Sequence, residues 1–192
     1  MTSEKYTLQQ AKTAKRIIKY FAKFQASIFL LSKGKLWNKW PGGFPIMVVE
    51  TRGAKSNKVR NIPLIYVHQE GMPILVASMG GMPKNPNWYY NVKANPKIKV
   101  STIHDQGNYL AEEVSKDKKD ELWPLICSFY PDYETYQNNT AREIPVFLCK
   151  EIISFEQFFL TIKSSARSIK KCLSFKYFLH FKTAAPVPSG LF

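Results

Sequence analysis

The sequence predicts an α+β fold: a small, mostly antiparallel β-barrel with helices at its openings and an amphipathic helical extension at each end. Short segments rich in β-branched residues, separated by turns, follow one another between residues 44 and 150. Residues 8–32 show a helical period instead. Most of the net charge of +14 lies near the two ends. We therefore expect a barrel domain at residues 41–150, between extensions at residues 1–40 and 151–192.

Residues 8–32 are expected to form a helix with one basic and one apolar face. The basic face holds Lys12, Lys15, Arg16, Lys19 and Lys23. The apolar face holds Ile17, Phe21, Phe24, Ile28 and Leu31. Such a helix most often packs its apolar face on the domain and leaves its lysines in solvent. The alternative is a helix that lies on an anionic membrane, with its lysines toward the lipid headgroups.

Six segments are predicted to be the strands of the barrel. They are residues 44–50, 59–68, 73–79, 97–103, 108–114 and 144–150. The turn "HQEGMP" after the second segment contains Gly71, which can adopt the positive φ that a tight hairpin requires. The stretch "HDQGN" (104–108) is expected to connect the fourth and fifth strands in the same way.

Two helices are predicted within the barrel domain, and an amphipathic tail after it. The first helix runs from Pro86 to Ala94 and ends before Asn95–Pro96, because proline disfavours the helical conformation of the residue before it. The second runs from Lys116 to Phe129. Residues 151–192 alternate apolar clusters with lysines and end in a segment without expected regular structure.

The charge distribution restricts the classes of partner. Residues 1–40 carry nine Lys and Arg against one acid, and residues 150–192 carry seven against two. The stretch between them is nearly neutral. This distribution favours contact of the ends with an anionic membrane surface over binding of nucleic acid by the whole domain. We find no recognisable nucleic-acid-binding motif and expect no nucleic-acid partner.

The cysteines and histidines predict a cytoplasmic protein without a metal site. Cys127, Cys149 and Cys172 are widely spaced, and no Cys/His spacing is typical of zinc. The polar N-terminus resembles no secretory signal, so the thiols are expected to be reduced. No run of eighteen uncharged apolar residues is present, so any membrane association is expected to be peripheral.

A basic loop, "GAKSNKVR" (53–60), joins the first two predicted strands. Lys55 and Lys58 offer point charges and Arg60 offers a planar fork, a combination that suits an anionic ligand. Asn57 tolerates the left-handed conformation that such a turn can require. The alternative is an exposed hairpin turn whose charges keep it in solvent.

Two further stretches have the composition of a binding site. The pair Gly80–Gly81 lets the backbone come close to a flat ring or a phosphate, unless it only ends a strand. Tyr130, Tyr133 and Tyr136 recur every three residues and share one face if the segment is helical. Three phenols can pack over a flat acceptor while one donates a hydrogen bond to a developing oxyanion, or they can simply pack on the barrel.

Three stretches in this order carry a resemblance to a known family. They are "TRGAKSNKVRNIPLIY", "ASMGGMPKNPNWYYNVKANP" and "FYPDYETYQNNTAREIPVFLC". The first is similar to a threonine–glycine–basic loop before a strand, and the third to a tyrosine-rich segment before an isoleucine–proline strand. Together they resemble the deazaflavin-dependent nitroreductase family, a branch of the split β-barrel flavin-binding proteins.

The resemblance implies a split β-barrel that binds coenzyme F420 and passes its hydride to a nitro compound, a quinone or an activated alkene. The residues expected at the anionic tail of the cofactor are Lys55, Ser56, Lys58 and Arg60. The residues expected along the cofactor's edge are Ser78, Met79, Gly80 and Gly81, with Trp88 and Asn91 beside them. Tyr133 is the first expectation for a catalytic residue, followed by Tyr136 and Tyr130. Trp88 could equally be a core anchor.

The sequence departs from the family pattern where Ala54 and Met79 stand in place of basic residues. Two alternatives therefore stay open. The same barrel could use FMN, or the chain could be a non-catalytic flavin- or lipid-binding module attached to membranes by its basic ends. The expected acceptor is a small hydrophobic molecule, and the chain is expected to be a monomer or a homodimer.

Overall fold

The structure, a computed structural model, describes residues 8–152, with side chains described from residue 20 onward. The helices are α1 (Leu8–Leu31), α2 (Asn87–Ala94), α3 (Lys116–Phe129) and α4 (Asp132–Asn138), with a 3-10 turn η1 (Met79–Gly81). The strands are β1 (Ile46–Arg52), β2 (Val59–Ile65), β3 (Val67–Gln69), β4 (Met72–Val76), β5 (Lys97–Ser101), β6 (Gln106–Glu113) and β7 (Val146–Glu151). The predicted C-terminal extension, apart from its first residues, lies outside the described residues, as do the side chains of Lys12, Lys15, Arg16, Ile17 and Lys19.

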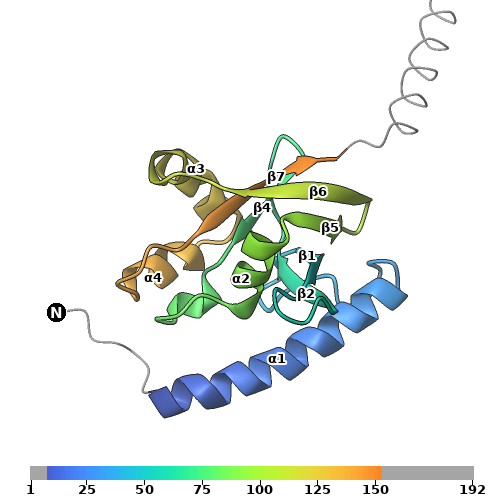
Figure 1. The fold of residues 1–192 in the computed structure, drawn as a ribbon, viewed down its shortest axis with the longest axis horizontal. Helices are drawn as coiled ribbons and strands as arrows, with labels where there is room; N and C mark the ends of the chain where they lie inside the picture. Colours follow the sequence, from blue (N-terminus) through green and yellow to red (C-terminus); the bar gives the residue numbers. More distant parts are fainter. Residues whose placement is uncertain (1–7, 153–192) are drawn as a thin grey trace, which may run out of the picture. The chain divides into compact units, whose positions relative to one another are not determined.

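The seven strands form one antiparallel sheet in the order β2-β1-β5-β6-β7-β4-β3. The two edge strands, β2 and β3, are consecutive in the chain and are separated only by Tyr66. A sheet whose opposite edges are joined so closely must curl until those edges approach each other. Figure 1 shows the result, a curled half-barrel with helices around it. The predicted α+β antiparallel barrel is confirmed.

The strand boundaries are shifted from the predicted ones, and two of the differences have a clear physical reason. The segment 59–68 is not one strand, because the chain changes its partner at Tyr66: β2 pairs with β1, whereas β3 pairs with β4. The connection expected at 104–108 begins earlier, because the Thr102 hydroxyl accepts hydrogen bonds from the N–H groups of His104 and Asp105. The turn between β3 and β4 is as predicted, with Gly71 at φ 83°.

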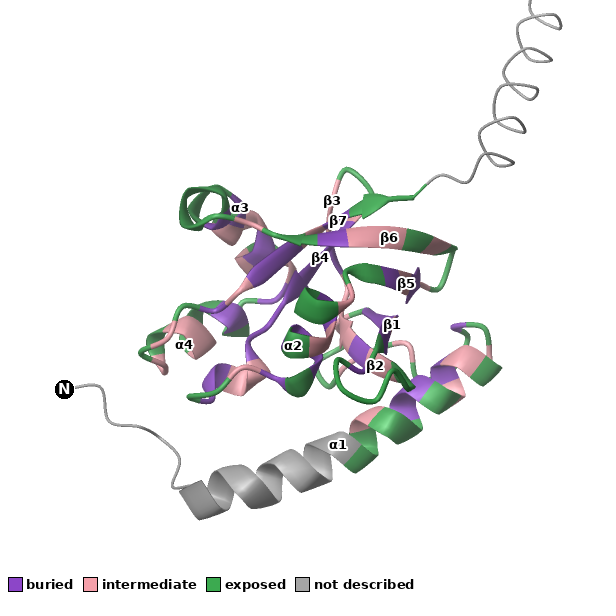
Figure 2. Ribbon diagram, viewed as in Figure 1, coloured by how far each residue is buried: buried purple, intermediate pink, exposed green. Residues whose placement is uncertain are grey.

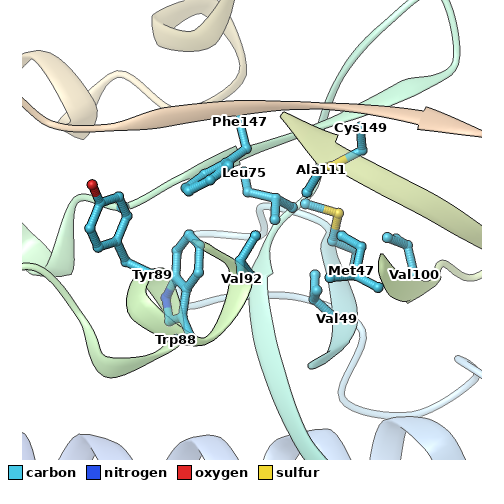
Figure 3. Close-up of a cluster of buried hydrophobic side chains, with 12 residues drawn as sticks. Met47, Val49, Leu75, Trp88, Tyr89, Val92, Val100, Ala111, Phe147 and Cys149 are labelled. Atoms are coloured by element: carbon cyan, nitrogen blue, oxygen red, sulfur yellow. The ribbon is translucent and has the colours of Figure 1, made fainter. Parts of the chain in front are cut away.

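The barrel core is filled mainly by side chains from the strands and from α2. Figure 3 shows Trp88 and Val92 of α2 facing Leu75, Phe147 and Met47 of the sheet. The Trp88 and Phe147 ring centroids are 6.2 Å apart. Trp88 is therefore a core anchor that fixes α2 on the barrel. In the same cluster, burial raises the pKa of the Cys149 thiol to about 12, so this thiol stays protonated at neutral pH.

The prediction of which α1 residues pack on the barrel is wrong. The face that packs on the sheet holds Gln25, Ala26 and Phe29, all nearly inaccessible to solvent. The small Ala26 allows close approach, and the Gln25 amide donates to the Lys39 carbonyl at 3.1 Å. Phe24 is 56% exposed and Leu31 is 86% exposed. Figure 2 shows exposed residues along the part of α1 from residue 20 onward, where side chains are described.

Among residues 8–152, no helix combines the length and the apolar character that crossing a lipid bilayer requires.

Candidate functional site

The basic loop between β1 and β2 is a compact turn with its cations in solvent. The Asn57 N–H donates to the Gly53 carbonyl at 2.8 Å, and the Gly53 N–H donates to the Lys58 carbonyl at 3.0 Å. Asn57 adopts φ 50°, the left-handed conformation expected for it. A Cβ on Gly53 would lie 2.6 Å from the Ser56 Oγ, so a larger residue there would require the Ser56 hydroxyl to move.

Three cations gather at this loop. Lys55 and Lys58 are exposed on the loop, and Arg60 lies at the start of β2 rather than on the loop. The Arg60 Nε is 3.5 Å from the position that a Cβ on Gly53 would take, so its guanidinium lies back over the turn. None of these cations takes part in the ion pairs found among the described residues. Their charge is therefore available to an external anion.

Helix α2 holds the basic loop in place. The Asn91 Oδ1 accepts a hydrogen bond from the Ala54 N–H at 3.0 Å, and the Asn95 amide donates to the Arg52 carbonyl at 3.3 Å. Asn91 thus connects the loop to the helix whose core anchor is Trp88. The two residues expected beside the cofactor have separate positions, because Trp88 is buried in the core and Asn91 is half-buried at the loop.

The glycine turn has an unusual backbone. Ser78 is right-handed helical at φ −68°, and Met79, Gly80 and Gly81 follow at φ 51°, 66° and 74°. A right-handed residue followed by a left-handed one turns successive N–H groups into a concavity that binds anions or carbonyl oxygens. A Cβ on Gly80 would meet nothing within 4 Å, so this side of the turn is open. The turn therefore offers backbone donors to a ligand.

The donors that the turn offers are fewer than predicted. The Gly81 N–H is taken by the Ser78 carbonyl at 3.1 Å. Among the hydrogen bonds of residues 20–152, none uses the N–H of Met79 or Gly80. The role of Gly81 is close packing instead, because its missing Cβ would lie 2.8 Å from the Tyr136 carbonyl of α4. The glycine turn and the tyrosine-rich helix are therefore in direct contact.

The three tyrosines form one cluster, although only Tyr133 and Tyr136 lie on α4 and Tyr130 precedes that helix in an extended conformation. The Tyr130 ring centroid lies 5.0 Å from that of Tyr133 and 6.1 Å from that of Tyr136. The Tyr130 and Tyr136 hydroxyls are 3.1 Å apart and share a hydrogen bond. Tyr130 and Tyr133 are each 5% exposed, whereas Tyr136 is half-buried and the most accessible of the three. Tyr136 is thus better placed than Tyr133 to meet a ligand.

Burial keeps two of these phenols protonated. It raises the pKa of Tyr133, and it raises the pKa of Tyr130, with the Tyr136 hydrogen bond adding to the effect. Both groups therefore remain neutral hydrogen-bond donors at physiological pH.

Sequence reasoning missed Arg142, which precedes β7. Its guanidinium donates to the Ser78 carbonyl at 2.7 Å, the Met82 carbonyl at 2.9 Å and the Ala77 carbonyl at 3.1 Å. The available signal was an arginine placed between the tyrosine-rich segment and a buried strand. That signal could not identify its partners, which lie 60 to 65 residues earlier in the chain.

Comparisons with known proteins agree on one family. The family described as F420H(2)-dependent quinone reductase matches residues 22–151. An F420H(2)-dependent quinone reductase of Mycobacterium tuberculosis (strain ATCC 25618 / H37Rv) is 32% identical over 123 residues, 62% of this chain and 83% of the relative. The deazaflavin dependence expected from the three stretches is confirmed. The family description names a quinone as the acceptor. Reduction of a nitro compound by this chain stays a prediction.

Two solved structures are similar as well. One, described as an F420-H2 dependent reductase, is 42% identical, covers 55% of this chain and 94% of its own, and has a TM-score of 0.53. The other, described as a domain-swapped dimer, is 34% identical, covers 72% of this chain and 95% of its own, and has a TM-score of 0.54. For this chain, the choice between monomer and homodimer stays a prediction.

The two glycines of the turn should respond differently to the same substitution. Both have positive φ, so alanine at either position costs about 1–2 kcal/mol of backbone strain. Gly81→Ala additionally forces a Cβ against the Tyr136 backbone, whereas Gly80→Ala places it in open space. We expect Gly81→Ala to lower the free energy of unfolding by clearly more than Gly80→Ala in urea denaturation. Equal losses would show that α4 does not pack against Gly81.

Proposed function

The chain belongs to the F420H(2)-dependent quinone reductase family, and we propose that it transfers hydride from reduced coenzyme F420 to a quinone. As a member of this family it is an oxidoreductase with F420 as its cofactor. The identity of the acceptor and the role of each residue are the proposal. The observation that carries it is the contact between a glycine turn with two free backbone N–H groups and a cluster of three tyrosines, with cations outside the ion pairs on the basic loop that α2 holds.

The residues present fit a large anionic cofactor. F420 carries a phosphodiester and an oligoglutamate tail, and Lys55, Lys58 and Arg60 would contact these groups, with Ser56 adding a hydroxyl. Flexible lysines suit a tail of variable length, and the Arg60 fork suits a carboxylate or a phosphate. The Met79 and Gly80 N–H groups would bind the edge of the ring, where the backbone alone forms the surface. When bound, the reduced cofactor supplies the hydride.

The tyrosines are proposed to serve the acceptor. A quinone carbonyl oxygen gains negative charge as hydride arrives, and a positioned phenol stabilises that charge by donating a hydrogen bond. The Tyr130 and Tyr136 hydroxyls share a hydrogen bond. In the proposal Tyr130 is its donor, so the Tyr136 hydrogen is left to point toward the acceptor. Tyr133 packs against both rings and holds the pair in place. Nitro compounds and activated alkenes develop similar charge, so the same donor would serve them.

A second proposal concerns where the acceptor is met: the α1 face lies on an anionic membrane. This face holds exposed apolar side chains from α1 and the segment after it. They are Tyr20, Phe21, Phe24, Leu31, Leu36 and Trp37. The Trp37 ring centroid is 5.3 Å from that of Phe24 and 5.9 Å from that of Phe21, so the aromatic residues form one cluster.

Charge around this aromatic cluster favours a lipid surface over a protein partner. Lys23, Lys33, Lys35 and Lys39 are exposed on the same stretch, and residues 5–49 contain no Asp or Glu. Exposed aromatic and aliphatic side chains surrounded by lysines are typical of peripheral binding to anionic bilayers. Each lysine near such a surface contributes about 1 kcal/mol. A membrane position would bring the enzyme to quinones dissolved in the bilayer.

Cofactor binding provides the first test. We expect the protein to bind oxidised F420 in a fluorescence titration, and Lys55→Ala combined with Arg60→Ala to weaken binding roughly tenfold or more. Added salt should weaken binding by the wild type more than by this variant, because the variant lacks two of the charges. Lys150→Ala is the matched control, because Lys150 is an exposed lysine paired with Glu112 on the far strands. Binding of FMN alone would replace the deazaflavin proposal, and binding of neither would contradict catalysis.

The proposed proton donor gives a second test. Tyr136→Phe removes one hydroxyl and keeps the ring, so we expect unchanged F420 affinity and a kcat for quinone reduction lower by roughly tenfold to a hundredfold. Tyr109→Phe, an equally conservative change at a half-buried position on β6, should leave kcat unchanged. Assays with a nitroarene and an enone identify which acceptors the donor serves. Wild-type kcat in the Tyr136→Phe variant would exclude this tyrosine as the donor.

Vesicle flotation tests the membrane proposal. We expect the full-length protein to float with vesicles of phosphatidylcholine and phosphatidylglycerol and not with phosphatidylcholine alone. Phe24→Ser combined with Trp37→Ser should reduce flotation, whereas Val59→Ser, at a similarly exposed apolar position on β2, should not. Substitution is preferable to truncation at residue 40, because truncation would remove the buried Phe29. The proposal would be contradicted if the double variant floated as well as the wild type. It would also be contradicted if the wild type formed a dimer that the double substitution dissociates.

A further inference from the structure

Arg142 makes a set of contacts that neither the family relation nor the proposed function explains. Its guanidinium binds three carbonyl groups of one turn, those of Ala77, Ser78 and Met82. It has no acidic partner among the ion pairs of residues 20–152. A cation whose hydrogen bonds go to backbone carbonyls rather than to a carboxylate acts on backbone conformation.

The backbone of Arg142 is itself fixed to α4. The Gln137 amide donates to the Arg142 carbonyl at 2.9 Å, and the Gln137 Oε1 accepts from the Ile144 N–H at 3.0 Å. The buried Lys119 ammonium donates to the same Gln137 oxygen at 2.8 Å. Arg142 is therefore a rigid connection between α4 and the glycine turn rather than a flexible surface side chain.

The turn needs such a connection. Met79 lies in the left-handed region, which is unfavourable for a residue with a side chain. Two left-handed glycines follow, and glycine has the largest conformational freedom to lose on folding. By binding the carbonyls on both sides of these residues, the guanidinium favours this one conformation of the turn. In that conformation the Met79 and Gly80 N–H groups stay free.

We propose that Arg142 is a positioning residue that holds the Ser78–Met82 turn against α4 and thereby sets the backbone donors of Met79 and Gly80 at a fixed place relative to Tyr136. Arg142 binds carbonyl groups of the turn, so the Met79 and Gly80 N–H groups stay free for a ligand. Lysine cannot replace it fully, because an ammonium lacks the planar fork that serves three separated carbonyls at once. The identity of the ligand in this proposal rests on the proposed function, whereas the effect of Arg142 on the turn conformation does not.

The first measurement uses the free protein, so that it is independent of cofactor binding. We expect Arg142→Ala to shift the backbone amide NMR signals of Met79, Gly80 and Gly81 and to speed hydrogen exchange at the Gly81 N–H, while the circular dichroism of the fold is kept. Arg142→Lys should give a smaller change. Phe29→Ala, which destabilises the distant α1 contact, is the control and should leave these amides unchanged.

The second measurement is F420 affinity. We expect Arg142→Ala to weaken binding at least about tenfold, because the Met79 and Gly80 N–H groups would no longer be held in place to donate to the ligand. Added guanidinium ion at non-denaturing concentration should restore part of the affinity, and ammonium ion should not. A variant with unchanged turn amides would overturn the proposal even if the wild type binds F420. If the turn changes as expected but the wild type binds no F420, the proposed function fails and the positioning role stands.

Discussion

The structure depends on one topological constraint, the joining of the two edges of the sheet. β2 and β3 lie at opposite ends of the strand order and are separated in the chain by Tyr66 alone. The sheet must curl to satisfy this connection, and the curl makes an interior that Trp88 and Phe147 fill from opposite sides. Because α2 is fixed by this core, its outer face can hold the basic loop through Asn91 at a defined position.

The candidate site is assembled from backbone as much as from side chains. The turn at Ser78–Met82 offers N–H groups because its carbonyls are bound by Arg142 and because Gly81 packs on α4 without a Cβ. The cations lie on a different element and are free because no acid pairs with them among the described residues. In the proposed function, recognition of the cofactor's ring and of its tail would be divided between these two elements, the glycine turn and the basic loop.

The position of α1 shows how one helix can serve both stability and contact. Its buried residues are few, with Ala26 and Phe29 against the sheet and Gln25 fixing the following segment through the Lys39 carbonyl. The larger aromatic residues contact one another and stay exposed to solvent. They are Phe21, Phe24 and Trp37. A helix needs only a narrow contact face to be held, so the rest of its apolar surface is available for a membrane.

The sequence by itself determined the antiparallel barrel and the helices α2 and α3, because strand alternation, helical period and turn residues act over a few neighbouring positions. It also placed the basic loop and the paired glycines, whose physical properties are local. Only the tertiary structure decided which face of α1 is buried and that Arg142 binds the glycine turn, 64 residues from Ser78. These features depend on which surfaces the curled sheet brings together, and such long-range contacts leave no periodic signal in the chain.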